Sequence, residues 1–326
     1  MLHDSVRMFS YRIWLAWISG LLLWSVPRFN RDAFWGGHPL NDAAGYIAYV
    51  QFFRGEPLSY ALYPAANWRP GVPFLASWLP FEPLTSINII NALLLIGCLV
   101  VHYAVLKRLA VPQDRLRVFM WLYVFSFPNF YYATIGYVEP GVLLLLHLGV
   151  LLMLRQNWFL LWGLLGLGVL FKEGIVVLMP VVGWWLRCVK SKVAALLWGI
   201  TSIGLVLGVS VWIRNAAPLT SDWNPGFWIL DSGVFIRNVT SWRAWGSGIL
   251  TLAPMLIWGF YQLRIRNAQL PSVHQNLAKA LALGVLGALL MYGFAFGTAA
   301  PDGRLLWAAY PFGWGILALL EWTGES

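Results

Sequence analysis

Long uncharged apolar runs recur along this chain, and they constrain its fold more than any other feature. The stretch Leu84 to Leu106 contains no Asp, Glu, Lys or Arg and is about as long as a helix that crosses a bilayer. Because a bilayer core offers no water to backbone groups, such runs span it as helices, whereas barrel strands would be shorter and alternating. With 60% hydrophobic and 11% charged residues, the sequence predicts an all-α polytopic membrane protein.

The apolar runs predict about ten transmembrane helices in a single transmembrane domain, 1–326. We expect two extracytoplasmic loops, 27–82, which would contain interfacial helices, and 215–248. The predicted spans are Tyr11 to Val26, Leu84 to Leu106, Val118 to Tyr132, Gly141 to Leu154, Trp158 to Phe171, Ile175 to Leu186, Val193 to Ile213, Ile249 to Leu263, Leu281 to Phe296, and Leu305 to Leu320.

The basic side chains indicate an orientation. If the N-terminus is cytoplasmic, the outer segments carry equal numbers of acidic and basic residues, and the whole net charge of +9 lies on the inner side. The basic balance therefore gives no reason to expect a nucleic-acid partner. We expect an integral membrane protein with both termini in the cytoplasm and a first span retained as an anchor. A bacterial inner membrane is favoured over the endoplasmic reticulum.

The first outer loop contains Asp42, followed by Tyr46, Tyr49, Val50 and Phe53 at three- and four-residue spacing. This spacing predicts an amphipathic helix lying on the outer membrane surface. Asp42 has two readings, which can hold together. It caps the helix, or it acts as a general base toward a hydroxyl held above the membrane.

Two further residues lie near predicted outer surfaces. Arg69 precedes the short apolar segment 72–79, which we expect to be interfacial or re-entrant, and it either binds phosphate or extends to lipid head groups. Glu139 begins the fourth predicted span, where an acid in the first turn favours the helix dipole. Tyr131, Tyr132 and Tyr137 form an aromatic rim near it, so Glu139 is also a candidate for lining a site.

Two charged pairs are wedged against apolar runs. Lys172 and Glu173 leave hardly any room for a loop, so they either neutralise each other or turn Lys172 toward an anionic ligand group. Asp302 and Arg304 lie at the outer entrance of the last predicted span. An Asp-Gly turn accounts for Asp302, whereas a guanidinium at the depth of Arg304 requires a phosphate or carboxylate partner.

The order of these features resembles the GT-C superfamily of membrane glycosyltransferases, which includes mannosyltransferase and aminoarabinose transferase-like families. The resemblance covers most of the chain and depends on D-x-x-x-Y at Asp42, R-P-G-x-P-x-L at Arg69, Y-x-E-P at Tyr137, K-E-G at Lys172 and R-L-L-x-x-x-Y-P at Arg304. It implies a sugar donor carried on polyprenyl phosphate. We expect no soluble C-terminal domain of the kind that larger members have, so the acceptor stays open among a lipid, a glycan and a protein.

The resemblance also implies roles for single residues. Asp42 and Glu139 would be catalytic, and Lys172, Arg304 and Arg69 would bind the donor phosphate. Contacts with the sugar or the acceptor would come from a further set: His38, Tyr46, Glu173, Tyr137 and Asp302. No cofactor other than the lipid-linked donor is required, and the sequence has no Cys/His metal-ligand spacing. Asp42 with Glu139 or Asp222 nevertheless has the oxygen ligands that a divalent cation binds.

Three other functions stay open. A polytopic transporter is disfavoured because ionisable groups are nearly absent from span interiors, where His147 is expected to be a hydrogen-bonded packing residue. A non-catalytic subunit of a cell-envelope assembly would not depend on Asp42. An acyltransferase would be expected to use an outer histidine, for which His38 is available.

Overall fold

The computed structural model describes residues 41–62, 67–218, 230–265, 271–298 and 303–321. Every regular element within these ranges is a helix, which confirms the all-α fold. In the part of the chain that the structure describes, three helices are long and apolar enough to cross a membrane: α5 (Pro83–Arg108), α11 (Lys192–Ala216) and α14 (Ser272–Thr298). The predicted span 11–26 lies outside the described residues.

The remaining helices are shorter or less apolar. Three of them, α8 (Glu139–Leu154), α9 (Trp158–Phe171) and α16 (Tyr310–Leu320), are short apolar helices. The others are α2 (Asn41–Arg54), α4 (Gly71–Ser77), α6 (Gln113–Val124), α7 (Phe127–Tyr131), η2 (Tyr132–Thr134), η3 (Glu173–Val177), α10 (Leu178–Val189), α12 (Ser232–Val239), α13 (Trp242–Ile265) and α15 (Arg304–Trp307).

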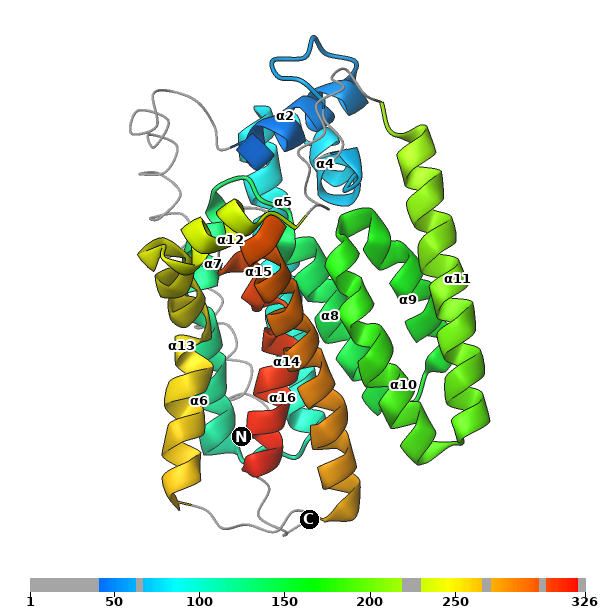
Figure 1. Ribbon diagram of the computed structural model, residues 1–326, viewed down its shortest axis with the longest axis vertical. Coiled ribbons are helices and arrows are strands. Elements are labelled where there is room, and N and C mark those ends of the chain that lie inside the picture. Colours follow the sequence, from blue (N-terminus) through cyan, green and yellow to red (C-terminus); the bar gives the residue numbers. More distant parts are fainter. Residues whose placement is uncertain (1–40, 63–66, 219–229, 266–270, 299–302, 322–326) are drawn as a thin grey trace, which may run out of the picture.

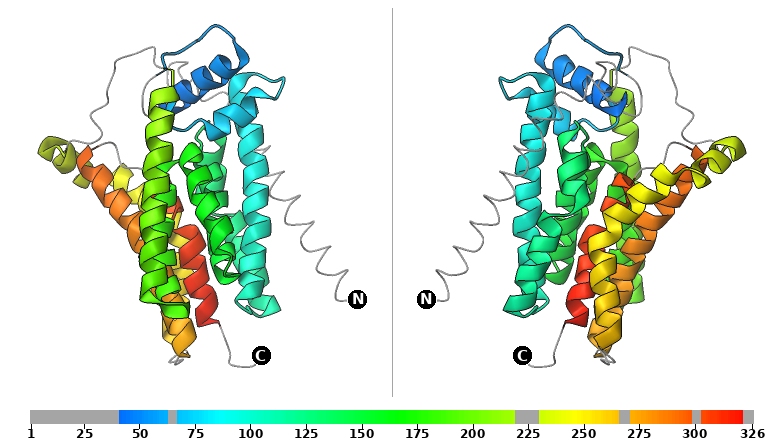
Figure 2. Two further views of the ribbon diagram at one scale, coloured as in Figure 1. Left: turned by 90° about the vertical axis from the view of Figure 1, so that its right-hand side faces the viewer. Right: turned by 90° about the vertical axis from the view of Figure 1, so that its left-hand side faces the viewer.

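The long helices run side by side, and α2 and α4 lie across one end of them, which we call the α2 end (Figure 1). Helix α5 packs along α8, while α14 contacts both α10 and α16. Figure 2 shows α2 and α4 at the same end from two further sides. Because α8 begins and α9 ends near α2, polar residues from distant parts of the sequence meet at this end.

Local signals explain where α5 begins and ends. Pro83 occupies its first turn, where a missing N–H costs nothing. The Glu82 carboxylate accepts from the backbone N–H groups of Leu84 and Thr85 at 3.0 and 2.9 Å, which satisfies two donors that the helix leaves unpaired. Lys107 and Arg108 lie in the last turn, where positive charge favours the helix dipole.

Three predicted spans are wrong as continuous helices. The span 118–132 is divided at Ser126 into α6 and α7, with Pro128 in the first turn of α7. The span 305–320 is divided into α15 and α16, and Pro311 begins the second piece. Both breaks follow from proline, which starts a helix well but cannot donate within one. The span 175–186 begins as the 3-10 helix η3 and continues as α10.

The second predicted loop also contains more helix than expected. Helix α12 lies inside it, and α13 begins at Trp242 rather than at Ile249, while residues 219–229 are outside the described part. Asp231 explains the start of α12, because its carboxylate accepts from the N–H groups of Gly233 and Val234 at 2.7 and 3.1 Å. Asn238 is buried and donates to the Phe296 carbonyl at 3.0 Å, which ties α12 to α14.

Helix α2 differs most from expectation, because it is not a one-sided surface helix. Tyr46, Ile47 and Val50 pack against α4 and α5, and Ala48 and Tyr49 pack on the opposite side with Leu62. At its end, Arg54 donates to the carbonyls of Ala76 and Ser77 in the last turn of α4 and to the carbonyl of Leu79 just after it. The helix carrying Asp42 is therefore held within the protein over its first turns.

Candidate functional site

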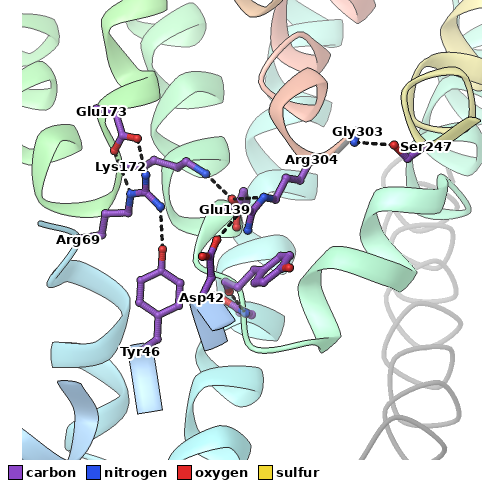
Figure 3. Close-up of polar contacts among 11 residues, drawn as sticks. Asp42, Tyr46, Arg69, Glu139, Lys172, Glu173, Ser247, Gly303 and Arg304 are labelled. Atoms are coloured by element: carbon purple, nitrogen blue, oxygen red, sulfur yellow. Dashed lines mark hydrogen bonds and ion pairs between the residues drawn. The ribbon is translucent and has the colours of Figure 1, made fainter. Parts of the chain in front are cut away.

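Four charged side chains from four distant segments meet at the α2 end, and we call them the charged cluster: Asp42, Glu139, Lys172 and Arg304 (Figure 3). Arg304 Nη2 lies 2.6 Å from Asp42 Oδ2, and Arg304 Nε lies 3.7 Å from Glu139 Oε1. Lys172 Nζ donates to the same Glu139 oxygen. Glu139 therefore joins two cations, one of which also holds Asp42.

The segment before Glu139 is shaped by a glycine and an asparagine. Gly136 has a φ of +82°, and a Cβ there would lie 2.7 Å from Leu84 and 3.1 Å from Ala43, so only glycine fits against the first turn of α2. Asn91 Nδ2 donates to the Tyr137 carbonyl at 2.6 Å. These contacts fix the chain where it enters α8.

The Tyr137 ring faces the Arg304 guanidinium, whose central carbon lies 4.2 Å from the ring centroid. A guanidinium over an aromatic face is held by the ring's quadrupole. Tyr137, which the resemblance assigned to substrate contact, is thus placed against a cation of the charged cluster.

Arg304 begins α15, and the glycine before it sets its position. Gly303 N donates to Ser247 Oγ at 3.0 Å, and a Cβ on Gly303 would lie 2.2 Å from the Ser247 carbonyl oxygen. The φ of Gly303 is −58°, so glycine is needed for close approach to α13 and not for an unusual backbone angle. Asp302, the other half of the Asp-Gly pair, is outside the described residues.

A second set of contacts lies beside the charged cluster. Arg69 binds Glu173 through two nitrogens, Nε to Oε2 at 2.9 Å and Nη2 to Oε1 at 2.5 Å, and donates from Nη1 to Tyr46 Oη at 2.9 Å. Lys172 and Glu173 therefore do not neutralise each other. The side chain of Arg69 is 16% exposed, and its guanidinium is directed to partners within the protein.

The electrostatics of the site are balanced, since its three acids face three bases. Burial raises the pKa of Asp42, but the positive charges of Arg304, Arg69 and Lys172 together outweigh burial and hold the pKa below its ordinary value. Partial burial also raises the pKa of Glu173, but its Arg69 partner lowers it to about 2. Burial lowers the pKa of Lys172, although the Glu139 carboxylate opposes that shift. Asp42 and Glu173 are consequently ionised at neutral pH.

A small pocket adjoins the charged cluster. Glu139, Lys172 and Arg304 supply its charged wall, and apolar residues, among them Met291 and Trp307, supply the rest. Glu139 Oε2 is buried and has no hydrogen-bond partner within the described part of the chain. The pocket thus offers two cations for an anionic group and one acceptor for a group that donates.

The other predicted site residues have different positions. His38 lies outside the described residues, as does Asp222. Tyr46 is 1% exposed and its hydroxyl contacts Arg69. Among the residues that the structure describes, no three His, Cys, Asp or Glu side chains are grouped to hold a metal ion.

Sequence reasoning missed several residues that build the site or lie deeper in the bundle. Asn91 could have been noticed as an amide within an apolar run, since such groups need partners in a membrane. No local signal marks Ser247 or Trp307. His147 contacts the Leu143 carbonyl through Nδ1 at 2.9 Å, which confirms it as a hydrogen-bonded packing residue. His102, which sequence reasoning did not single out, packs edge-to-face against the ring of His147.

Comparison with protein-family models, curated proteins and solved structures found no match for this chain.

Proposed function

We propose that this protein is a membrane glycosyltransferase that moves a sugar from a polyprenyl-phosphate carrier to an acceptor hydroxyl on the extracytoplasmic side. One observation carries the proposal: two acids and two cations from distant segments form one connected set, and three of the four, Glu139, Lys172 and Arg304, line a pocket. An acid for proton removal beside cations for a phosphate is the set that this transfer needs.

Asp42 is the proposed general base. It takes the proton of the acceptor hydroxyl, whose oxygen attacks the anomeric carbon of the donor sugar. The bond between that carbon and the phosphate oxygen breaks, and the electron pair leaves with polyprenyl phosphate. Attack from the face opposite the leaving group inverts the anomeric configuration. Glu139 holds the two cations in place and presents its second oxygen to a sugar hydroxyl.

Lys172 and Arg304 are the proposed ligands of the departing phosphate. Both lie in a wall of the pocket and are shielded from water, with side chains 7% and 19% exposed. Each cation fixed in such surroundings stabilises developing negative charge by about 3 kcal/mol. A phosphate bound to Arg304 also competes with Asp42 for the guanidinium, so donor binding frees the carboxylate to accept a proton.

The membrane setting belongs to the same proposal. We propose about ten spans, N- and C-termini in the cytoplasm and a bacterial inner membrane. The apolar side chains of α11 that face outward, such as Leu196, Ile200 and Leu207, support contact with lipid chains. A donor with a polyprenyl tail would reach the site from that lipid. The acceptor would be a lipid, a glycan or a protein.

The test is a transfer assay with purified protein in lipid vesicles and a panel of polyprenyl-phosphate sugars. The variant Asp42→Asn keeps the size of the side chain but cannot take a proton, so we expect its transfer rate to fall about 10²- to 10⁴-fold. Asp114→Asn is the matched control, because Asp114 is 75% exposed and lies at the far end of the bundle. In a parallel assay a chelator is added, and a loss of transfer there would show that a divalent cation is needed.

Three outcomes would oppose the proposal. Equal rates for wild type and Asp42→Asn would show that this aspartate is not the base. No transfer from any donor by the wild type, together with uptake of a solute into the same vesicles, would favour the alternative of a transporter. A cell-envelope subunit would show neither activity.

A further inference from the structure

Arg69 uses all three nitrogens of its guanidinium within the protein. Nε and Nη2 bind the two oxygens of Glu173 in the paired geometry that suits a carboxylate, and Nη1 donates to the hydroxyl of Tyr46. The side chain of Arg69 is 16% exposed, whereas that of Glu173 is 53% exposed. Arg69 is therefore committed to protein partners before any ligand binds.

Both partners of Arg69 lie next to a member of the charged cluster. Tyr46 follows Asp42 by four residues on α2, so the two side chains lie on the same face of the helix. Glu173 directly follows Lys172 in the sequence. Figure 3 shows Arg69 between the segment with Lys172 and the helix with Asp42. Through these contacts it connects the proposed base to a proposed phosphate ligand.

Apolar packing holds the same junction from the other side. Phe171 precedes Lys172, and its ring packs against two glycines. A Cβ added to Gly71 would lie 2.8 Å from the nearest ring atom, and a Cβ added to Gly141 would lie 2.3 Å from the ring. The end of α9 is thus pressed against the first residue of α4 and the first turn of α8. Three successive residues, Phe171 to Glu173, each hold a different part of the site.

From this geometry we infer that Arg69 and Glu173 form a positioning pair, which sets the distance between Asp42 and Lys172 and does no chemistry itself. The inference rests on the proposed function for the roles of those two residues. It differs from the assignment of Arg69 to the donor phosphate, which the family resemblance implies. Its physical basis is that a shift of about 1 Å in a reacting group can lower a rate about 100-fold.

Exchanging the charges of Arg69 and Glu173 distinguishes a positioning role for Arg69 from a role in binding the donor phosphate. Arg69→Glu and Glu173→Arg each break the pair, and we expect each to lower kcat about 10- to 100-fold with little change in KM for the donor. The double variant restores an ion pair with reversed polarity and should recover most of kcat. Arg155→Glu, an exposed arginine at the far end of α8, is the control for charge reversal itself.

A phosphate-binding Arg69 gives a different pattern. KM for the donor would rise in Arg69→Glu, and Glu173→Arg would lose less activity than Arg69→Glu. The double variant would stay inactive because residue 69 is then an acid. That pattern overturns the inference. Wild-type kcat in both single variants, measured per folded protein, overturns it as well.

A second measurement does not depend on catalysis. Spin labels on cysteines placed at Phe52 of α2 and Leu167 of α9, which are 44% and 48% exposed, report the distance between the two helices. Cys188 is exposed and is replaced by Ser, while the buried Cys98 is kept. We expect a narrow distance distribution in the wild type, a broad one in each single variant and a narrow one in the double variant.

The two measurements keep the two ideas apart. If the wild type transfers no sugar but the label distances follow the ion pair, the proposed function fails and the positioning of α2 by Arg69 stands. If the wild type is active and the distances are the same in all variants, the positioning inference fails and the proposed function stands.

Discussion

Two buried glutamates at opposite ends of the helix bundle illustrate how different the two ends are. Glu139 lies at the α2 end and Glu321 follows α16 at the other end, and their side chains are 5% and 2% exposed. Glu321 Oε1 accepts from Trp258 Nε1 and from Gln262 Nε2, and its Oε2 lies 3.7 Å from Arg115 Nε. Both oxygens of Glu321 are thus occupied by groups on α13 and α6.

Glu139 is equally buried but is paired differently. Its Oε1 lies between two cations, whereas Oε2 has no partner within the described residues and the side chain lines a pocket. A buried acceptor left unpaired destabilises the folded protein, so it marks a place where another requirement is being met. Both glutamates are charged and buried, so these properties do not distinguish them. What distinguishes the structural carboxylate of Glu321 from the candidate site at Glu139 is whether the second carboxylate oxygen has a partner.

The largest effect that would test this comparison is expected at Lys172. Lys172→Met removes a cation from the pocket wall while keeping much of the side-chain length, and we expect kcat per folded protein to fall about 10²- to 10³-fold. The transfer assay with fixed acceptor measures it. Lys190→Met, at an exposed lysine after α10, is the control, and an equal loss in both variants would remove the distinction between the two ends.

A smaller loss is expected when Arg304 is displaced rather than removed. Gly303→Ala places a Cβ against the Ser247 carbonyl oxygen, so the start of α15 has to shift. If Arg304 binds the donor phosphate as proposed, its misplacement should lower kcat about 10- to 100-fold. Gly163→Ala is the matched control on α9, where an added Cβ meets nothing within 4 Å. Wild-type kcat in Gly303→Ala would mean that Arg304 need not be held where the structure places it.

Stability, and not activity, should respond at the other end. Glu321→Ala leaves the N–H groups of Trp258 and Gln262 without their acceptor, at a cost of about 1–3 kcal/mol of unfolding free energy. We expect a lower unfolding temperature in detergent and an unchanged kcat for the folded fraction. Asp114→Ala serves as the control, since surface ion pairs contribute little. A loss of kcat without a change in stability would reverse the roles of the two ends.

The smallest expected effect is a displacement of the pH profile. A general base works when deprotonated, and Arg304, with Arg69 and Lys172, holds the pKa of Asp42 below its ordinary value. If Asp42 is the base as proposed, the acidic limb of kcat/KM lies below the ordinary aspartate range. In Arg304→Met the burial of Asp42 is no longer opposed by this cation, and the limb should move to higher pH. Arg304→Lys keeps the charge and should move it less. A limb that stays fixed in Arg304→Met would exclude Asp42 as the titrating group.

The fold was predictable where one residue type settles the local choice. The limits of α9, Trp158 and Phe171, agree with the sequence prediction because a polar residue and a lysine bound an uninterrupted apolar run. At Pro128 and Pro311 the sequence prediction continued one span through each proline, but in the structure a new helix begins there. The spacing of tyrosines on α2 predicted a helix with one apolar face lying on the membrane surface, whereas Tyr46 and Tyr49 are buried in the protein, as are Ile47 and Ala48 on other sides.

The sequence by itself determined which charged residues exist near the ends of apolar runs. Alternation of spans then brought Asp42, Glu139, Lys172 and Arg304 to a common end, because a helix that crosses the bundle reverses the end at which the next one begins. Tertiary structure alone decided the partners. Lys172 and Glu173 are adjacent in sequence, yet they bind Glu139 and Arg69, because adjacent side chains point in different directions and distant segments supply the opposing charges.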